Sequence, residues 1–241
     1  MFETFFIKPL YNVFVYLIGV MPAGDVGLAI IAMTLIVRIV FYPAFTASIR
    51  TQMGMQAVQA ELDEINKKYK DSAEERARHT LALYKTKNIR PFAGILALLV
   101  QLPIFIALYF ALFRESLPGI AENLLYSFVQ VPQVINLHFL GFINLVAAHN
   151  ILLSLLVGVL QYLVAHLAMA RTKPGAQGLS KERQAAQKMQ QNMMLYMFPA
   201  LIAVIAYTLP AAVGIYFAAT NIISLGQEWL IRRKILNGTP S

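Results

Sequence analysis

The strongest chemical requirement in this chain belongs to Arg38, which lies inside an otherwise uncharged stretch, residues 26–45. A helix rises about 1.5 Å per residue, so Arg38 lies about 18 Å from the Val26 end, well inside the ~30 Å hydrocarbon core of a bilayer. An arginine at that depth costs about 2.5 to 17 kcal/mol, depending on how far water and lipid relax around it. No other predicted span offers a carboxylate at comparable depth, so the sequence predicts that this guanidinium needs water or a visiting partner.

Polar side chains in the apolar stretches could surround Arg38 and form a hydrophilic pocket. Four of them recur at a spacing of four and would share one face of a continuous helix: Thr34, Arg38, Tyr42 and Thr46. The later stretches contribute Gln101, Ser154, Gly158, Gln161, Thr220, Asn221, Ser224 and Gln227. Small and hydroxyl side chains commonly pack transmembrane helices together. Packing does not explain an unpaired guanidinium, because intramembrane charges normally face a bundle interior or a watery cavity.

The composition favours a polytopic membrane protein over a soluble enzyme. Of 241 residues, 58% are hydrophobic and only 13% are charged. The chain has no cysteine, which excludes disulfides and thiol catalysis. Its four histidines show no metal-ligand spacing, and there is no nucleophile elbow, HExxH motif or Walker loop. We therefore predict no catalytic residue, no metal, no cofactor and no enzymatic activity.

These patterns predict an all-α polytopic membrane protein with five transmembrane helices around a hydrophilic groove. The chain divides into an external amphipathic interfacial helix (1–24), transmembrane helix 1 (25–49), a cytoplasmic helical hairpin (50–91), transmembrane helix 2 (92–113), an external loop (114–141), transmembrane helix 3 (142–170), a cytoplasmic loop (171–188), transmembrane helices 4 and 5 (189–231) and a cytoplasmic tail (232–241).

The basic residues predict the orientation. Of the 20 Lys and Arg residues, nine lie in segment 50–91, five in 171–188 and three in 232–241. By the positive-inside rule these segments are cytoplasmic, so the N-terminus is outside and the C-terminus is cytoplasmic. The net charge of +8 is then mostly a signature of topology and does not predict a specific nucleic-acid partner.

The segment before the first span allows two interpretations. Residues 2–20 could form a sixth span, or an amphipathic helix lying in the outer interface. Lys8, Pro9 and Asn12 favour the interfacial helix. The apolar side chains of the external loop predict that it rests on the membrane surface.

The cytoplasmic segment is predicted to be a helical hairpin. Val58, Leu62, Ile65 and Tyr69 recur at helical spacing, as do Ala77, Leu81 and Tyr84. Between these stripes, Ser72 and Glu75 form a capping box. The hairpin could be a simple link between two spans, but about 40 residues is longer than a link requires. We therefore expect it to receive the substrate or its targeting machinery.

Methionines gather at the cytoplasmic borders of two predicted spans. They are Met53, Met55, Met193, Met194 and Met197. Such flexible side chains suit a surface that binds varied apolar sequences, although ordinary packing is the alternative for each of them.

Several sequence blocks, in this order, resemble the YidC/Oxa family of membrane protein insertases. They are PLYN at 9–12, GLAIIAMTLIVRIVFYP with Arg38, QAELDEINKKYKDSAEE and LALYK in the hairpin, QLPIFIALYFALF with Gln101, and MMLYMFPALIAVIAYTLPAAVGIYFAATNIISLGQ at the end. The chain departs from the family at Tyr216-Phe217, where Tyr-Trp is frequent.

The resemblance implies a groove that is open to the cytoplasm and laterally to lipid and closed outside. The groove residues expected to bind substrate are Arg38, Thr34, Tyr42, Gln101, Gln161, Tyr216, Phe217 and Asn221. The residues expected to contact the substrate or its targeting machinery are Met53, Met55, Met193, Met194, Met197, Glu61, Lys67, Lys68 and Lys85.

The resemblance also implies the cellular context. It places the chain in the bacterial cytoplasmic (inner) membrane as an insertase and chaperone for nascent membrane proteins. The expected partners are these nascent chains, the lipid bilayer, the Sec translocon, the ribosome and the signal-recognition machinery. Two alternative functions are a small anion transporter or channel, with Arg38 as its anion site, and an assembly chaperone that does not translocate segments.

Overall fold

The computed structural model describes residues 5, 7–89, 106, 109, 117–169 and 181–236, and most of them are helical. In chain order the elements are α1 (Lys8–Val20), η2 (Pro22–Gly24), α2 (Val26–Val40), α3 (Tyr42–Ala57), α4 (Gln59–Lys68), α5 (Ala73–Thr86), η4 (Glu122–Leu124), β1 (His138–Phe139), β2 (Ile143–Asn144), α7 (Ile151–Met169), α8 (Lys181–Asn192), the π-helical turn η5 (Met193–Met197), α9 (Phe198–Thr208) and α10 (Ala211–Leu236). The predicted second span, with Gln101, lies outside the described residues.

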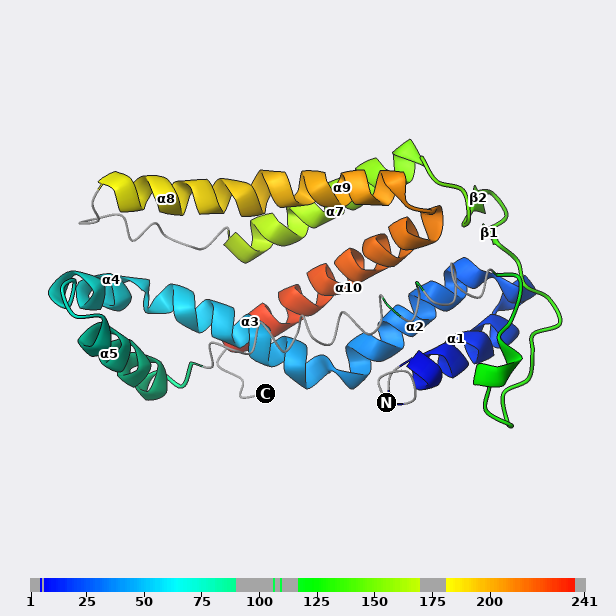
Figure 1. The fold of residues 1–241 in the computed structure, drawn as a ribbon, viewed down its shortest axis with the longest axis horizontal. Helices are drawn as coiled ribbons and strands as arrows, with labels where there is room; N and C mark the ends of the chain where they lie inside the picture. Colours follow the sequence, from blue (N-terminus) through cyan, green and yellow to red (C-terminus); the bar gives the residue numbers. More distant parts are fainter. Residues whose placement is uncertain are drawn as a thin grey trace.

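The helices form an elongated bundle in which α10 is central (Figure 1). On one side α10 packs against α7, which in turn packs against α9. On the other side α10 packs against α2 and α3. The hairpin of α4 and α5 and the start of α8 lie at one end of the bundle, and the loop that carries β1 and β2 lies at the other. The described parts of two segments predicted to be cytoplasmic, the hairpin and the start of α8, therefore lie at the same end.

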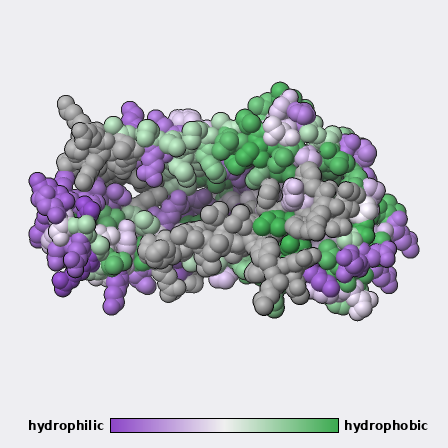
Figure 2. Space-filling model, in the orientation of Figure 1, coloured by the Kyte–Doolittle hydropathy of each residue, from purple (hydrophilic) through white to green (hydrophobic). Residues whose placement is uncertain are grey.

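The outer faces of α7 and α9 are apolar and exposed. On α7 these exposed side chains include Leu152, Leu155 and Val159, and on α9 they include Leu201 and Val204. Figure 2 shows hydrophobic residues gathered over this part of the surface and hydrophilic residues at the end formed by α4 and α5. Exposed aliphatic faces of this kind suit contact with lipid tails.

Within the described residues, two helices are long and apolar enough to cross a bilayer, Ile151–Met169 and Lys188–Thr208. A third candidate is the pair α2 and α3 taken as one broken span. The 26-residue helix α10 is long enough but carries a polar face. A mostly helical chain with apolar spans is confirmed, and the arrangement of five spans around a groove stays a prediction.

The first predicted span is wrong as one straight helix, since Thr34 and Arg38 lie on α2 whereas Tyr42 and Thr46 lie on α3. The chain breaks at Phe41, and the axes of α2 and α3 differ by 69°. Pro43 explains the break, since it has no N–H to donate to the carbonyl four residues earlier and its ring clashes with that carbonyl. It also disfavours helical geometry at the residue before it.

The third span also begins later than predicted. Helix α7 starts at Ile151, whereas residues 143–144 form strand β2, paired antiparallel with β1. The Asn150 carboxamide accepts a hydrogen bond from Leu153 N at 3.0 Å and so caps the helix. The polar side chains that precede Ile151 favour turns, so the predicted span is not helical before that residue.

The fourth predicted span begins close to the predicted residue 189, because the apolar candidate span starts at Lys188. Its Pro199 lies directly after the π-helical turn η5, as expected where a proline removes a backbone donor. Close packing against α7 occurs at Gly158, where an added Cβ would lie 3.0 Å from the Ala203 methyl group. Gly158 is therefore a packing residue of the kind found between membrane helices.

The predicted hairpin is present as α4 and α5. The Ser72 hydroxyl accepts a hydrogen bond from Glu75 N at 3.3 Å, as the capping box predicts. Val58, Leu62 and Ile89 form a small core, against which Tyr84 packs. Leu81, predicted to lie in the apolar stripe, is 63% exposed and is not part of this core.

Helix α1 holds the external loop through two buried polar side chains. Asn12 donates to Leu124 O at 2.8 Å and accepts from Tyr126 N at 2.6 Å. The Tyr11 hydroxyl accepts from Ala121 N at 2.9 Å. The 13 residues of α1 extend about 20 Å, which is shorter than a hydrocarbon core. The expectation that the loop rests only on lipid is wrong in part, since Val129 is buried in the protein core.

Asp25 fixes the same loop to the start of α2. Its Oδ1 accepts from Gly27 N at 2.8 Å and Leu28 N at 3.1 Å, which caps the helix, and its Oδ2 accepts from Leu140 N at 2.8 Å. Gly24 has a φ of +64°, and a Cβ there would collide with Val134 O. Asp25 is thus a clamp between α2 and the external loop.

We expect Asp25→Ala to release this loop. The loss of the cap costs about 1 kcal/mol, and each buried N–H left unsatisfied adds about 1–3 kcal/mol. Because the chain has no cysteine, Val129→Cys supplies a unique buried probe. Maleimide labelling of this probe should become at least five-fold faster with Asp25→Ala, and Asp71→Ala, at an exposed carboxylate, is the control. Equal labelling rates with and without Asp25 would contradict the clamp.

Candidate functional site

Arg38 is buried inside the bundle, with 9% of its surface exposed. Its Nη1 donates to Gln227 Oε1 on α10 at 3.2 Å, and Gln227 Nε2 donates back to the Arg38 carbonyl at 3.3 Å. Its guanidinium also lies over the Phe45 ring, 4.2 Å from the centroid. All these partners are neutral. Among the described residues, no carboxylate forms a salt bridge with Arg38.

The carboxylate next to Gln227 in sequence is already paired. Glu228 is buried and binds Arg232 on the same helix, where Arg232 Nε donates to Glu228 Oε1 at 2.8 Å and Nη2 lies 2.6 Å from the same oxygen. A buried charge held by a partner one helical turn away is not free to neutralise a second cation. Among the described residues, the positive charge of Arg38 therefore has no carboxylate partner.

Sequence reasoning counted Gln227 among the polar side chains that could surround Arg38 but left it out of the expected groove residues, and it missed Phe45. The signal for Gln227 was present, because it follows Thr220, Asn221 and Ser224 on the polar face of α10. No sequence pattern pointed to Phe45. Its ring lies over the Arg38 guanidinium beyond the bend between α2 and α3.

The remaining groove candidates on α2 and α10 are buried. Thr34 is 3% exposed and its hydroxyl donates to Ile30 O at 2.7 Å, a bond within its own helix. Tyr216 is buried beside Phe217, with ring centroids 5.6 Å apart. Asn221 is 4% exposed, and within the described ranges its Nδ2 has no hydrogen-bond partner. A buried donor without a partner is costly in an apolar interior, so this side of α10 suits a polar ligand or water.

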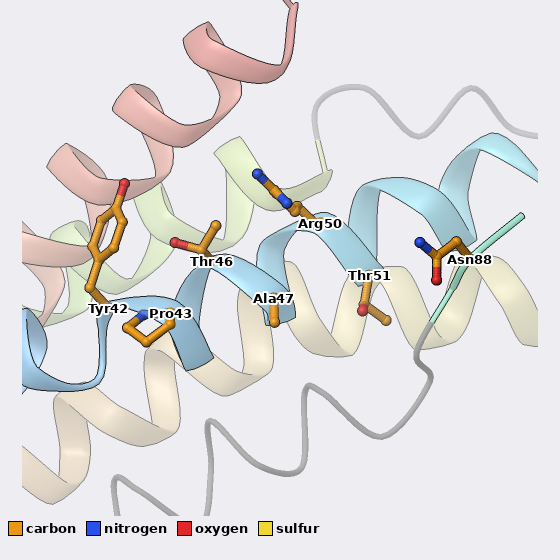
Figure 3. A pocket seen from close by; sticks show the side chains of 7 residues that line it. All are labelled: Tyr42, Pro43, Thr46, Ala47, Arg50, Thr51 and Asn88. Carbon is orange, nitrogen blue, oxygen red and sulfur yellow. The ribbon is translucent and has the colours of Figure 1, made fainter. Parts of the chain in front are cut away.

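Tyr42 and Thr46 line a cavity of about 410 Å³ beside α3. Its other described lining residues are Pro43, Ala47, Arg50, Thr51 and Asn88. Figure 3 shows Tyr42, Thr46 and Arg50 extending from one face of α3, on the side where α10 runs. Three hydroxyl groups, one amide and one guanidinium thus border the cavity, which we name the α3 cavity.

Gln161 is half-buried on α7, the helix that packs against α9 and α10. Ser154, on the same helix, is buried and donates to Ile151 O at 2.9 Å. Among the described residues, the side chains that contact Arg38 are Gln227 and Phe45 and not Gln161 or Ser154, and Gln101 lies outside the described residues. Of the predicted groove set, the structure therefore places Arg38 directly against α10 and Tyr42 at the α3 cavity.

The predicted methionines fall into two groups. Met193 and Met197 are about half exposed and line a shallow apolar hollow of about 660 Å³ with Met189 and Tyr196. Met194 is also exposed, on the same π-helical turn. Met53 and Met55 are half-buried on α3, and Met55 packs against the hairpin core.

The predicted hairpin contacts are all exposed. Glu61 binds Lys87 Nζ at 2.8 Å across the hairpin, Lys68 lies over the Tyr69 ring at 5.4 Å, and Lys67 and Lys85 face outward. No group of three His, Asp or Glu side chains in the described part of the chain could hold a metal ion.

Comparison with known proteins identifies the family. The family model of the 60Kd inner membrane protein matches residues 18–238. This chain belongs to that family. It is 31% identical over 238 residues to the membrane protein insertase YidC of Oceanobacillus iheyensis, an alignment that covers 97% of this chain and 84% of the relative.

Longer relatives match the same region. The membrane protein insertases YidC of Histophilus somni and Cellvibrio japonicus are each 27% identical to this chain, over 231 and 230 residues. The alignments cover 95% of this chain in both cases, but 37% and 36% of the relatives. The chain thus spans just over a third of the length of these two relatives, but 84% of the length of the Oceanobacillus iheyensis relative.

We expect Arg38 and Gln227 to be energetically coupled. A double-mutant cycle with Arg38→Leu and Gln227→Leu, measured by reversible unfolding in mixed micelles, should give a coupling of about 0.5–2 kcal/mol. The control cycle pairs Arg38 with Ser224, whose hydroxyl donates within α10 to Thr220 O. Additive effects in the Gln227 cycle would show that the reciprocal hydrogen bonds do not hold Arg38.

Proposed function

We propose that this chain is a membrane protein insertase that passes nascent membrane segments into the bilayer through a hydrophilic groove containing Arg38. Family membership and the YidC relatives support the insertase function. The observation that carries the groove is the buried Arg38 guanidinium with neutral partners only, among the described residues. Such a charge favours an anionic visitor and water at membrane depth.

The proposed groove runs between α2, α3 and α10. Arg38, Gln227 and Asn221 supply polar atoms on its walls, and Tyr42 and Thr46 extend it along α3. Gln101 and Gln161 complete it in the proposal. Polar walls replace water lost by a translocating segment and shorten the apolar path that the segment must cross.

Energy for insertion comes from the substrate. Burial of its apolar side chains contributes about 0.8 kcal/mol per CH₂ group, which moves the substrate helix out of the groove into lipid along spans one, two and five. The membrane potential assists an acidic segment by about 2.3 kcal/mol per charge per 100 mV. No nucleotide is required in this scheme.

The proposed orientation puts the N-terminus outside and the hairpin and C-terminus in the cytoplasm. The clustering of basic segments supports this orientation, as does the position of the hairpin and the start of α8 at the same end of the bundle. The proposed partners are nascent membrane proteins in the lipid bilayer, with the Sec translocon, the ribosome and the signal-recognition machinery as helpers.

Substitutions of Arg38 test the electrostatic role. In proteoliposomes, Arg38→Lys should retain most insertion of a single-span substrate with an acidic translocated tail. Arg38→Glu should lower it at least ten-fold, which corresponds to about 1.4 kcal/mol. The same substrate with a neutral tail is the matched control and should be much less sensitive. Full activity of Arg38→Gln on the acidic substrate would show that Arg38 hydrates the groove and does not attract the acidic tail. Anion flux that Arg38→Gln eliminates would instead favour a transporter.

Deletion of Glu61–Lys85 tests the hairpin as a receiving element. The hairpin core is separate from the main core, so the remaining helices should stay folded in the membrane while insertion is abolished. Tryptic resistance of the remaining helices controls for folding. Insertion at the normal rate by the deletion variant would refute a receiving role.

A further inference from the structure

The α3 cavity contains a second cation that the proposed mechanism leaves without a role. Arg50 is exposed and contributes its side chain to the cavity wall, together with the hydroxyls of Tyr42, Thr46 and Thr51. Asn88, which follows α5, closes the side toward the hairpin (Figure 3). This combination of a guanidinium, hydroxyls and an amide matches the hydrogen-bonding needs of a carboxylate.

The Thr46 hydroxyl shows that the cavity suits a polar ligand. Thr46 is only 9% exposed, and no described residue lies within hydrogen-bond distance of its Oγ1. Protein interiors rarely leave such a group unpaired, because its desolvation is not compensated. An acceptor atom of a ligand in the cavity would accept a hydrogen bond from this hydroxyl.

The α3 cavity and the Arg38 site are connected through neighbouring residues of α3. Phe45, whose ring covers the Arg38 guanidinium, directly precedes Thr46, so the two sites share one helical turn of α3. Arg50 follows Phe45 by five residues, a rise of about 7–8 Å along the helix. A side chain bound near Arg50 and Thr46 therefore has a short path to Arg38.

We propose that the α3 cavity is a docking site for an acidic side chain of the inserted segment, held by Arg50 and Thr46 before it moves to Arg38. This inference rests on the insertase function proposed above. Arg50 binds the carboxylate through its N–H groups, and Thr46 donates its O–H. The carboxylate moves from one guanidinium to the next and stays ionised throughout.

A peptide fits the cavity better than a phospholipid headgroup does. Tyr42, Thr46 and Arg50 extend to the side of α3 where α10 runs, and the Thr46 side chain is buried there. Asn88 connects the cavity to the end of the hairpin, the element proposed to receive the substrate. A peptide leaving the hairpin would therefore meet Arg50 before Arg38.

The test compares two substrates in proteoliposomes that contain the full chain. One single-span substrate carries two Asp residues in its translocated segment, and the other carries two Asn residues at the same positions. Arg50→Gln should lower the ratio of acidic to neutral insertion rates about five-fold, and Thr46→Val about two-fold. Arg50→Lys should keep most of the ratio. Lys70→Gln, which removes an exposed cation of the hairpin turn, is the control.

Each outcome decides the proposal. An unchanged ratio with Arg50→Gln would overturn it while leaving the insertase function intact. Equal losses for both substrates that vary with the anionic-lipid content of the vesicles would assign the cavity to a lipid headgroup, and would also overturn it. Failure of the unsubstituted chain to insert either substrate above protein-free vesicles would instead reject the proposed function.

Discussion

The burial of one guanidinium among apolar helices is the constraint on which the rest of this bundle depends. Arg38 cannot shed its charge, because an arginine stays protonated in proteins. The protein compensates with a neutral amide, an aromatic face and a helix bend that brings both to the same place. None of these partners cancels the charge, so the site remains attractive to an anion.

Helix α10 supplies polar groups that the buried charge of Arg38 requires. Its polar face carries Asn221 and Gln227 toward the interior, and its Glu228 is neutralised by Arg232 within the same helix. The Glu228 carboxylate is thus paired within α10, whereas the Arg38 guanidinium of α2 has only neutral partners among the described residues, as the proposed groove requires.

The two ends of the bundle differ in how tightly they are held. At the outer end, Tyr11, Asn12 and Asp25 satisfy buried backbone groups of the external loop and fix it against α1 and α2. At the other end, α3 carries a cavity with an unpaired hydroxyl and leads to an exposed charged hairpin. A tightly held loop at one end and a polar cavity at the other are compatible with the proposed passage of a peptide segment from the hairpin end.

The sequence by itself determined the helical class, the hairpin with its Ser72 cap and the membership of the insertase family. These features depend on periodicity, charge and local capping, which act over a few residues. The sequence also contains Pro43, whose missing N–H breaks the first span, but the prediction of one straight helix did not take this proline into account. The pairing of Arg38 with Gln227, residues 189 positions apart, was decided only by the tertiary structure. The packing of α10 against both α2 and α3 brings these distant residues together, and no local pattern encodes which side chains of two separate helices will meet.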